Sequence, residues 1–546
     1  MRKYLLVALF LWCIQLFAQN NKYWIRFTDK NNNAFSVSNP QQFLSAQSIE
    51  RRTKQNISIN ESDLPLSTVY VDNISPYITQ LIHRLKWFNL VVVQIDDETL
   101  LDSIKQFSFV DSVAKIEFNP SRSEQKQNKF ESVSPVNQQI IYPNQYGAAY
   151  RQTNMLNVDL LHQMGYRGAG VTISMMDNGY SNANIIAAYD SVRPRILNTW
   201  DFVNNEPDVY NDGGHGENTF SCIAANLPNK FLGTAPDANF FLFTTEDDGA
   251  EWVMEEYNWA AAAEVADSAG AQIFSTSLGY TTFDGGIGSH TYSDLNGHST
   301  VITNASNYAF GKGILVLNSA GNEGAKSWHY IAAPADGDSV LAIGAVDSAE
   351  IVTDFSSRGP NAAGRIKPDI CSQGAKSAVV GTDGYVGYSA GTSFSCPIMA
   401  GAAACLWGAF PDKSAREIYD AIVISADHFW TPDNNHGYGI PNFYNAFLLL
   451  KTNYNANLLQ IDNNVIVYPN PFTNQLNISL FSEEAATHKI EIFDLQGSKV
   501  YSADIYLRNQ TFEMVKLDGI QQLAAGKYVL RLDGNKKFSH LLIKTK

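Results

Sequence analysis

The sequence predicts a central α/β domain with a doubly wound parallel sheet, preceded by a small α+β domain and followed by a β-sandwich. Three stretches of the 546 residues support this division. Short apolar runs alternate with helical stretches at 142–452, which is the pattern of parallel strands joined by crossover helices. Helices and strands also mix at 20–120, whereas short strands of alternating polarity occupy 460–546.

Composition and charge indicate a globular protein and argue against one class of function, nucleic-acid binding. Hydrophobic residues make up 45% of the chain and charged residues 17%, as in ordinary globular proteins. The formal net charge is −15, so the chain lacks the basic surface with which general nucleic-acid binders contact phosphates. We therefore expect a globular protein that does not bind nucleic acid.

Residues 1–18 have the pattern of a secretory signal peptide. Arg2 and Lys3 precede an apolar run at 4–14, and the small residue Ala18 ends the segment. The run is shorter than the roughly 20 apolar residues that cross a bilayer, and no later segment reaches that length. We expect an exported, soluble protein without a membrane span.

The domain at 20–120 should form a sheet with helices on one face. In the helix predicted over 43–56, Arg51 and Arg52 are expected to be exposed. A second helix is predicted over 75–88, because serine is a good N-cap residue and the following proline suits the first helical position. The other predicted elements are strands at 22–27, 90–95 and 113–118 and a helix at 98–107. Residues 121–141 are polar and aperiodic, so they are predicted to be an exposed linker that is open to proteolysis.

The central domain, 142–452, places two polar residues at the ends of buried strands. Apolar runs predict strands at 170–176, 271–277 and 313–318, with a helix at 251–270. Asp177 follows the first of these strands, and Asn322 follows the last. Functional residues of parallel sheets gather at such carboxyl ends, although a simple turn would explain either residue alone.

Two further candidates lie at predicted helix starts. His215 has a glycine on each side, and Ser393 lies in the small-residue run 391–401. A helix start offers free N–H groups and the positive end of the helix dipole. Alone, a surface histidine or a tightly packed helix would account for these features. Together the four residues supply a nucleophile, a base for its proton, a carboxylate to orient that base and an amide to stabilise an oxyanion.

With these four residues in place, the chain resembles the subtilisin-like serine peptidases over about 145–450. The resemblance implies that Ser393 is the nucleophile, His215 the general base, Asp177 its orienting acid and Asn322 an oxyanion donor, with the Ser393 N–H as a second donor. It also implies a substrate-binding role for Ser275, Ser277, Leu278, Gly279, Ser319, Ala320 and Gly321. The matching motifs are Met176–Gly179, His215–Gly216, Gly233–Ala238, Ser275–Gly279, Ala320–Gly324, Phe355–Pro360, Lys367–Asp369 and Gly391–Pro397.

Three residues depart from the motifs of that family. Asn178 and Glu217 stand where hydroxyl residues are common, and Cys396 replaces a small residue three positions after the nucleophile. None of these changes removes a catalytic group. A carboxylate at 217 would add negative charge near the imidazole and raise its pKa.

The flanking domains also carry resemblances. The domain at 20–120 has the position of the inhibitory propeptide of that family. The motif at 468–472, the strand at 526–531 and the basic C-terminus resemble a type IX secretion sorting domain. This resemblance implies export through the periplasm of a Gram-negative bacterium to the exterior or cell surface, with the secretion machinery as a partner. The plainer alternative for 460–546 is an accessory β-sandwich that binds substrate or a cell surface.

Two other protein classes fit parts of the pattern. An α/β-hydrolase would need glycine where Ser395 stands, and its catalytic residues follow a different order. A secreted scaffold that has lost activity should lack one of the four candidates, and none is missing. The expected reaction needs no cofactor. Structural calcium fits the family, but no acidic cluster has a spacing that assigns a site.

The cysteines do not predict a metal site or a disulfide scaffold. Cys13 belongs to the predicted signal peptide, and no CxxC spacing occurs among the others. Buried free thiols are the simplest expectation, with one bridge left open in an oxidising compartment. The remaining four are Cys222, Cys371, Cys396 and Cys405.

Overall fold

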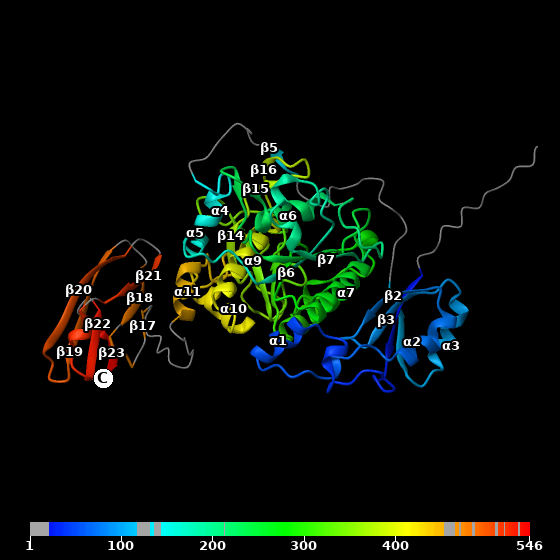
Figure 1. The fold of residues 1–546 in the computed structure, drawn as a ribbon, viewed down its shortest axis with the longest axis horizontal. Coiled ribbons are helices and arrows are strands. Elements are labelled where there is room, and N and C mark those ends of the chain that lie inside the picture. Colours follow the sequence, from blue (N-terminus) through cyan, green and yellow to red (C-terminus); the bar gives the residue numbers. More distant parts are fainter. Residues whose placement is uncertain are drawn as a thin grey trace, which may run out of the picture.

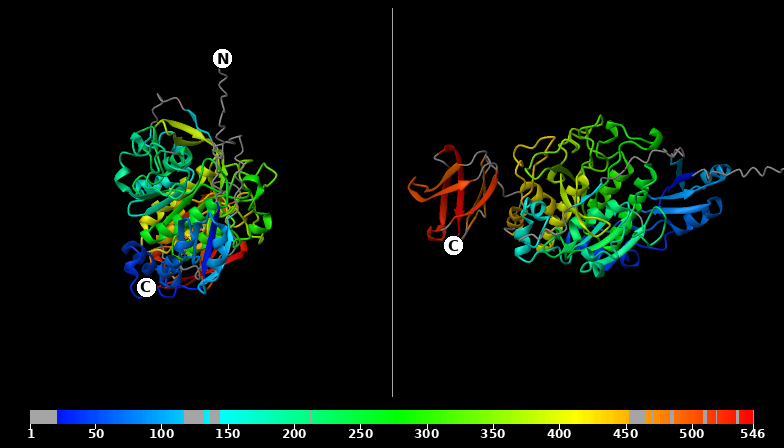
Figure 2. Two further views of the ribbon diagram at one scale, coloured as in Figure 1. Left: turned by 90° about the vertical axis from the view of Figure 1, so that its right-hand side faces the viewer. Right: turned by 90° about the horizontal axis from the view of Figure 1, so that it is seen from above.

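The computed structural model contains three compact units that follow one another along the longest axis of the molecule (Figures 1 and 2). The predicted signal peptide and most of the predicted linker lie outside the described residues. No helix among the described residues is long and apolar enough to cross a membrane. The structure describes residues 21–116, 132–135, 144–211, 213–451, 465–468, 471–474, 476–482, 486–507, 511–517, 519–532 and 535–545.

The N-terminal unit is a four-stranded antiparallel sheet in the order β2-β3-β1-β4. Alternate residues of β1 and β3 point to opposite faces of the sheet. Ile25 and Val91 pack with the helices of this unit, whereas Leu90 and Val92 pack with the central unit. The elements are β1 (Lys22–Phe27), α1 (Ala46–Lys54), α2 (Thr68–Ile74), β2 (Gln80–Leu85), β3 (Leu90–Gln94), α3 (Leu101–Lys105) and β4 (Val110–Lys115).

The helix predicted over 75–88 is wrong. Its first residues form a single 3-10 turn, Ser75–Tyr77, and the chain then becomes β2. Strand β2 forms a hairpin with β3, and Asn89 in the turn has a φ of 53°. His83 and Leu85 are buried where β2 meets the central unit. Pairing and packing across the sheet therefore outweigh the local capping signals.

The prediction that Arg51 and Arg52 are exposed is also wrong. Both guanidinium groups are buried between α1 and α7 (Met254–Ala269) of the central unit. Arg51 pairs with Asp267 of α7 at 2.5 Å, and Arg52 pairs with Asp267 and with Asp63, each at 2.8 Å. A carboxylate 216 residues away along the chain gives these charges a buried partner. The N-terminal unit is therefore attached to the central unit by buried ion pairs as well as by apolar contacts.

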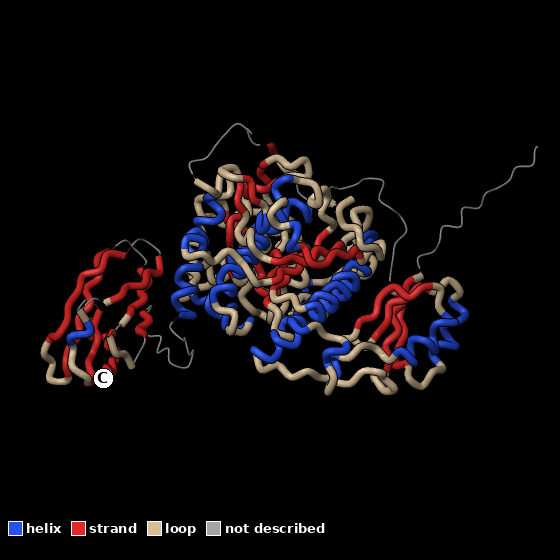
Figure 3. The backbone as a smooth tube through the Cα atoms, viewed as in Figure 1, coloured by secondary structure: helices blue, strands red, loops and turns tan. Residues whose placement is uncertain are grey.

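The central unit is built on a parallel seven-stranded sheet in the order β14-β13-β12-β11-β6-β10-β7, which confirms the predicted fold class. Helices α6 and α9 pack on one face of this sheet, and α7 and α8 pack on the other. Figure 3 shows the helices in blue around the red strands of the central unit. The strands are β6 (Thr172–Asp177), β7 (Ile196–Asp201), β10 (Asn239–Thr244), β11 (Ile273–Thr276), β12 (Leu315–Ser319), β13 (Val340–Val346) and β14 (Ile370–Gln373). The other helices are α4 (Tyr150–Asn154), α5 (Val158–Gln163), α6 (Gly214–Ala224), α8 (Val301–Gly311), α9 (Thr392–Ala409), α10 (Ala415–Ile424) and α11 (Phe443–Lys451).

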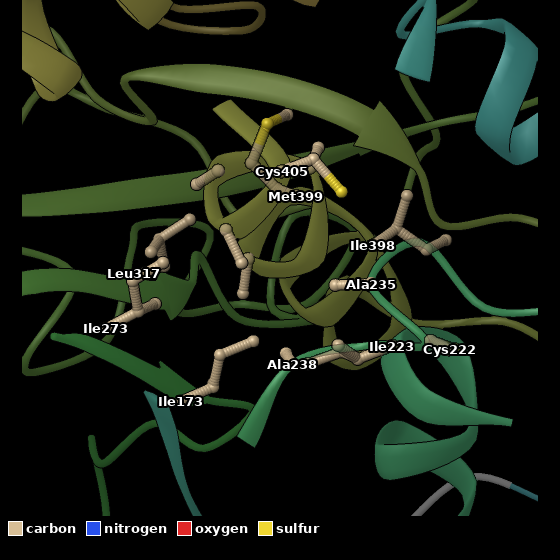
Figure 4. Packing of buried hydrophobic residues seen from close by; sticks show 14 of the residues in the cluster. Ile173, Cys222, Ile223, Ala235, Ala238, Ile273, Leu317, Ile398, Met399 and Cys405 are labelled. Atoms are coloured by element: carbon tan, nitrogen blue, oxygen red, sulfur yellow. The ribbon is translucent and has the colours of Figure 1, made fainter. Parts of the chain in front are cut away.

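Helix α9 passes through the core of the central unit. Its side chains are buried on all sides from Thr392 to Trp407, as expected for a helix that is apolar around its whole circumference. The hydrophobic cluster around α9 includes Ile173, Ile273 and Leu317, which come from three neighbouring strands of the sheet (Figure 4). The start of α9 is thus fixed in position relative to the sheet.

Small antiparallel sheets complete the central unit. β15 (Ser377–Val380) and β16 (Val386–Ser389) form a hairpin, and β5 (Ser134–Pro135) adds a third strand to it. β8 (Asn226–Leu227) pairs with β9 (Phe231–Leu232). Strand β16 lies immediately before α9 in the sequence.

The C-terminal unit consists of two antiparallel sheets, in the orders β17-β18-β21 and β20-β19-β22-β23. Val467 and Ile478 of one sheet share a hydrophobic core with Ile490, Leu530 and Leu542 of the other, as in the predicted β-sandwich. The strands are β17 (Val465–Tyr468), β18 (Asn477–Ser482), β19 (Ala486–Asp494), β20 (Lys499–Leu507), β21 (Thr511–Lys516), β22 (Gly526–Leu532) and β23 (Asn535–Lys544).

Candidate active site

Ser393 lies in the first turn of α9, where backbone N–H groups are not used by the helix. The preceding Gly391 has an extended backbone, so the chain changes from strand-like to helical just before the serine. The Ser277 hydroxyl donates to the Ser393 carbonyl at 2.7 Å, and the Ser393 hydroxyl donates to the Ser277 carbonyl at 3.4 Å. These contacts tie the start of α9 to the loop after β11.

Asp177 and His215 come together between the end of β6 and the start of α6. His215 Nδ1 lies 2.6 Å from Asp177 Oδ1, and both side chains are buried. The same carboxylate accepts the Asn178 N–H at 2.8 Å and the Thr219 hydroxyl at 3.1 Å. A proton held on Nδ1 by the carboxylate leaves Nε2 as the basic nitrogen of the ring.

Gly216 explains why the histidine and the aspartate can approach so closely. A Cβ at this position would lie 2.2 Å from the Gly179 carbonyl oxygen and 2.9 Å from Asp177 Cβ. Either distance is too short for a side chain. The glycine after His215 is therefore required by the close contact of α6 with the end of β6.

Asn322 is oriented by the residue that precedes the nucleophile. Its side-chain oxygen accepts the Thr392 N–H at 2.9 Å and the Thr392 hydroxyl at 3.0 Å. Because these donors identify the oxygen, the amide nitrogen points in the other direction as a donor. Asn322 is thereby coupled to the helix start that carries Ser393.

The predicted substrate-binding residues lie at the carboxyl ends of β11 and β12, which are neighbours in the sheet. Hydrogen bonds connect the two loops: the Leu278 carbonyl oxygen accepts one from the Asn318 side-chain amide at 2.8 Å and one from the Ser319 hydroxyl at 3.3 Å. The other residues brought to these loops are Ser277, Gly279, Ala320 and Gly321, the last with a φ of 105°. Ser275 differs, because it lies inside β11 and its backbone faces strands on both sides.

Glu217, where the sequence suggests a negative charge near the imidazole, lies in the same helix α6 as His215. Its side chain is buried, and the Tyr189 hydroxyl donates to Oε1 at 2.6 Å. Oε2 has no hydrogen-bond partner among the described residues. Burial raises the pKa of this carboxyl well above its ordinary value, which favours its neutral form.

We expect Glu217→Gln to stabilise the fold, and more strongly as the pH rises. A carboxyl with a raised pKa in the fold costs nothing below its unfolded pKa and an increasing amount above it. The amide should therefore raise the melting temperature by about 2–4 °C at pH 8 and by little at pH 4.5. Thermal unfolding of proteins that carry Ser393→Ala measures this without self-digestion. The exposed Glu50→Gln is the control, and an equal gain at both pH values would contradict the expectation.

Cys396 packs behind the nucleophile and is a neutral thiol. Its Sγ lies 3.4 Å from the Thr276 carbonyl oxygen, and burial raises its pKa to about 12. Cys222, Cys371 and Cys405 are likewise buried and unbridged, so the described structure contains free thiols and not the optional disulfide.

Two threonines that the sequence did not single out orient the residues of the site. Thr219 follows His215 by one helical turn and reaches the same carboxylate, so a spacing of four residues was its signal. Thr392 directly precedes the nucleophile and binds Asn322. No local sequence pattern predicts the contact of Thr392 with Asn322, because the two residues are 70 positions apart in the chain.

The fold and the site define an α/β protein in which Asp177 contacts His215 and Asn322 binds Thr392, the residue before Ser393. The His215 ring lies 6.0 Å from that of Phe394, the residue after Ser393. Residues 168–441 match the model of the subtilase family. The chain therefore belongs to the subtilase family. Residues 22–132 match a peptidase S8 propeptide domain of Bacteroidota, and residues 466–544 match a secretion system C-terminal sorting domain.

Curated relatives resemble the central part of the chain. Serine protease AprX of Bacillus subtilis is 28% identical over 317 residues, which is 51% of this chain and 66% of the relative. A thermophilic serine proteinase of Bacillus sp. is 28% identical over 280 residues, 51% of this chain and 62% of the relative. Subtilisin E of Bacillus subtilis is 27% identical over 333 residues, 59% of this chain and 77% of the relative. The chain thus spans less than two thirds of the first two of these relatives.

Proposed function

We propose that this chain is a secreted serine endopeptidase that cleaves peptide bonds through an acyl-enzyme on Ser393. The observation that carries the proposal is the 2.6 Å contact of Asp177 with His215 Nδ1, in a subtilase domain that also supplies a serine and an oriented asparagine amide. The curated relatives, which are serine proteinases by name, support the same reaction class.

In the proposed mechanism, His215 Nε2 takes the Ser393 proton while Oγ attacks the carbonyl carbon of the substrate. Asp177 keeps the ring in the correct tautomer and stabilises the imidazolium. His215 then gives its proton to the leaving amine, and the peptide bond breaks. Water attacks the acyl group in the second half-reaction, again with His215 as base, and frees Ser393.

Asn322 is proposed to donate to the oxyanion that forms on the carbonyl oxygen. The Ser393 N–H, at the start of α9, is the second donor in this proposal. Thr392 holds the Asn322 amide before substrate binds, so little reorganisation is needed as charge develops. Extended substrate backbone would lie along Ser277–Gly279, with the specificity pocket between these residues and Ser319–Gly321.

The flanking units are proposed to control where and when this activity appears. The N-terminal unit, a propeptide domain by its match, would act as inhibitor until the linker is cleaved. The C-terminal sorting domain would be recognised by the secretion machinery after passage through the periplasm of a Gram-negative cell. Proteins and peptides are the proposed substrates. The proposed chemistry uses only side chains and backbone groups, so it requires no cofactor.

A fluorophosphonate probe tests the proposal, because it phosphonylates only a serine activated by an adjacent base. Secreted, processed protein should be labelled on the peptide that contains Ser393. Ser393→Ala, processed with an added protease, should not be labelled. Ser395→Ala is the matched control, because that buried hydroxyl bonds to the Thr392 carbonyl. Equal labelling of Ser393→Ala and wild type would refute the assignment.

A further inference from the structure

We propose that Trp252 and Asp247 form a subsite for a lysine or arginine side chain of the substrate, on the side that precedes the cleaved bond, and that Lys22 fills this subsite in the uncleaved chain. The inference rests on the proposed peptidase function and specifies one determinant of its substrate class. It starts from an ammonium group that the N-terminal unit places on an aromatic ring of the central unit.

The ring belongs to Trp252, just before α7, and the cation belongs to Lys22, the first residue of β1. The Lys22 Nζ atom lies 4.3 Å from the centre of the indole ring. At this distance the negative face of the ring attracts a cation, and tryptophan does so more strongly than other aromatic side chains. The charge of Asp247 also favours the protonated form of this lysine. The uncleaved chain therefore already holds a cation at this place.

The segment around the ring is acidic and is fixed by the central unit itself. No lysine or arginine occurs between Lys230 and Lys312. The buried Glu255 carboxylate accepts the Asp247 N–H at 2.9 Å and the Trp252 N–H at 3.1 Å. Ring and charge are thus held by a residue that remains when the N-terminal unit leaves. The carboxyl residues of this segment are Glu246, Asp247, Asp248, Glu251, Glu255 and Glu256.

Removal of the N-terminal unit should make the subsite more favourable for a cation. In the uncleaved chain, burial lowers the pKa of Lys22 to about 8, and the charge of Asp247 acts in the opposite direction. The loss of water around the ammonium group therefore offsets part of the attraction. In the processed enzyme, a cation on Trp252 would keep more of its water, while the ring and Asp247 remain. We therefore expect this enzyme to bind a basic side chain here.

The chain passes Trp252 before it enters the linker. Ile116, the last described residue before the linker, donates its N–H to the Lys22 carbonyl oxygen at 2.8 Å. Ile116 and Trp252 also belong to one hydrophobic cluster. In the proposed processing, the cleaved bond lies in the linker and so follows Ile116. The subsite therefore lies beside residues that precede this bond.

Contacts within the central unit connect the subsite to the catalytic residues. The hydrophobic cluster that contains Trp252 also includes Leu278, one of the proposed substrate-binding residues. Asp248, in the acidic segment, accepts the side-chain amide of Asn178, the residue after the catalytic acid, at 2.8 Å. An extended substrate that pairs with the loop after β11 would therefore bring one of its side chains near Trp252.

Peptide p-nitroanilides test the inference on protein processed with an added protease, because they contain only residues that precede the cleaved bond. In a set of tetrapeptide substrates, one lysine replaces alanine at the second, third or fourth residue before the bond. At one of these positions, lysine should raise kcat/KM about tenfold over norleucine, which has a similar apolar chain and no charge. No preference above twofold at any position would overturn the inference.

Two variants assign the preference to the subsite. Trp252→Leu should reduce the lysine-to-norleucine ratio of kcat/KM to below threefold, because leucine keeps an apolar contact but has no ring face. Asp247→Asn should lower the ratio about threefold, while its amide oxygen can still accept the Gly249 N–H. Asp412→Asn is the control, because it removes an exposed charge beyond the end of α9 that lies opposite Ser393.

The norleucine substrate monitors the fold in these variants, since its kcat/KM should fall less than threefold in each of them. If Trp252→Leu damages the fold, the ratio in the isosteric Asp247→Asn decides. A ratio that stays at the wild-type value in the site variants, or that falls equally in Asp412→Asn, would show that the preference does not come from this subsite.

The two proposals fail in distinguishable ways. If wild-type protein does not react with the fluorophosphonate probe, the peptidase function itself is wrong. If it reacts and cleaves the norleucine substrates without preferring lysine, only the cationic subsite is wrong. Glutamate at the favoured position provides a further readout. It should give a lower kcat/KM than norleucine because the acidic segment repels it, and a value equal to that of lysine would contradict the assignment.

Discussion

Asp177→Asn should lower kcat by about 10⁴-fold, with a much smaller change in KM. The variant keeps the shape of the side chain, but its amide cannot hold a proton on His215 Nδ1 as the carboxylate does at 2.6 Å. The ring then favours the tautomer with the proton on Nε2, where it cannot accept the proton of Ser393. The asparagine also provides no negative charge for the imidazolium that forms during reaction.

Hydrolysis of a peptide p-nitroanilide, by protein matured with an added protease, measures this effect. Thr219→Val is the matched control, because it removes only the hydroxyl that bonds to the other oxygen of Asp177 at 3.1 Å. We expect a loss of tenfold or less in the control. An Asp177→Asn enzyme that retained more than a tenth of the wild-type kcat would show that the carboxylate does not orient the base.

Asp267→Ala should weaken the attachment of the N-terminal unit by about 3–5 kcal/mol, or roughly 10²–10⁴-fold in affinity. The carboxylate is buried and pairs with Arg51 and Arg52, and Lys86 lies 3.5 Å away. The pKa of Asp267 is lowered to about 2, against desolvation, by these cations. Its removal leaves two buried guanidinium groups without their common partner.

The measurement is the rate at which the N-terminal unit dissociates once the linker is cut. A Ser393→Ala background prevents digestion of the released unit, and size-exclusion chromatography after dilution follows its loss. Asp102→Ala on the exposed side of α3 is the control, since its ion pair with Lys105 faces solvent. Equal half-lives for Asp267→Ala and the control would show that the buried ion pairs contribute nothing to attachment.

Most of the central fold followed from local pattern. Strands at 172–177, 273–276 and 315–319 fall inside or beside the predicted apolar runs, because buried parallel strands are apolar on both faces. The wrong prediction of a helix at 75–88 has a different cause. Residues 80–85 form a strand only because β3 and the central unit lie beside them, and neither contact is visible in the local sequence.

In the candidate site, too, local sequence predicts some features, whereas others depend on contacts between distant residues. Asp177, His215, Asn322 and Ser393 were predictable because each stands next to a strand end or helix start, where a polar residue in an apolar setting is conspicuous. Their mutual orientation could not be predicted, because it depends on a contact between Thr392 and Asn322, which are 70 residues apart in the chain. The raised pKa of Glu217 could not be predicted either, since it depends on burial beside Tyr189.

The reactivity of the four buried thiols can report how the central unit opens. Cys222, Cys396 and Cys405 belong to the main core on α6 and α9, whereas Cys371 lies in β14 within a small separate cluster. A thiol reagent cannot reach any of them until the surrounding structure opens, so each alkylation rate measures a local opening equilibrium. If Cys371 reacts before the other three, the β14 edge opens as a unit of its own; if all four react together, the central unit opens as one cooperative body.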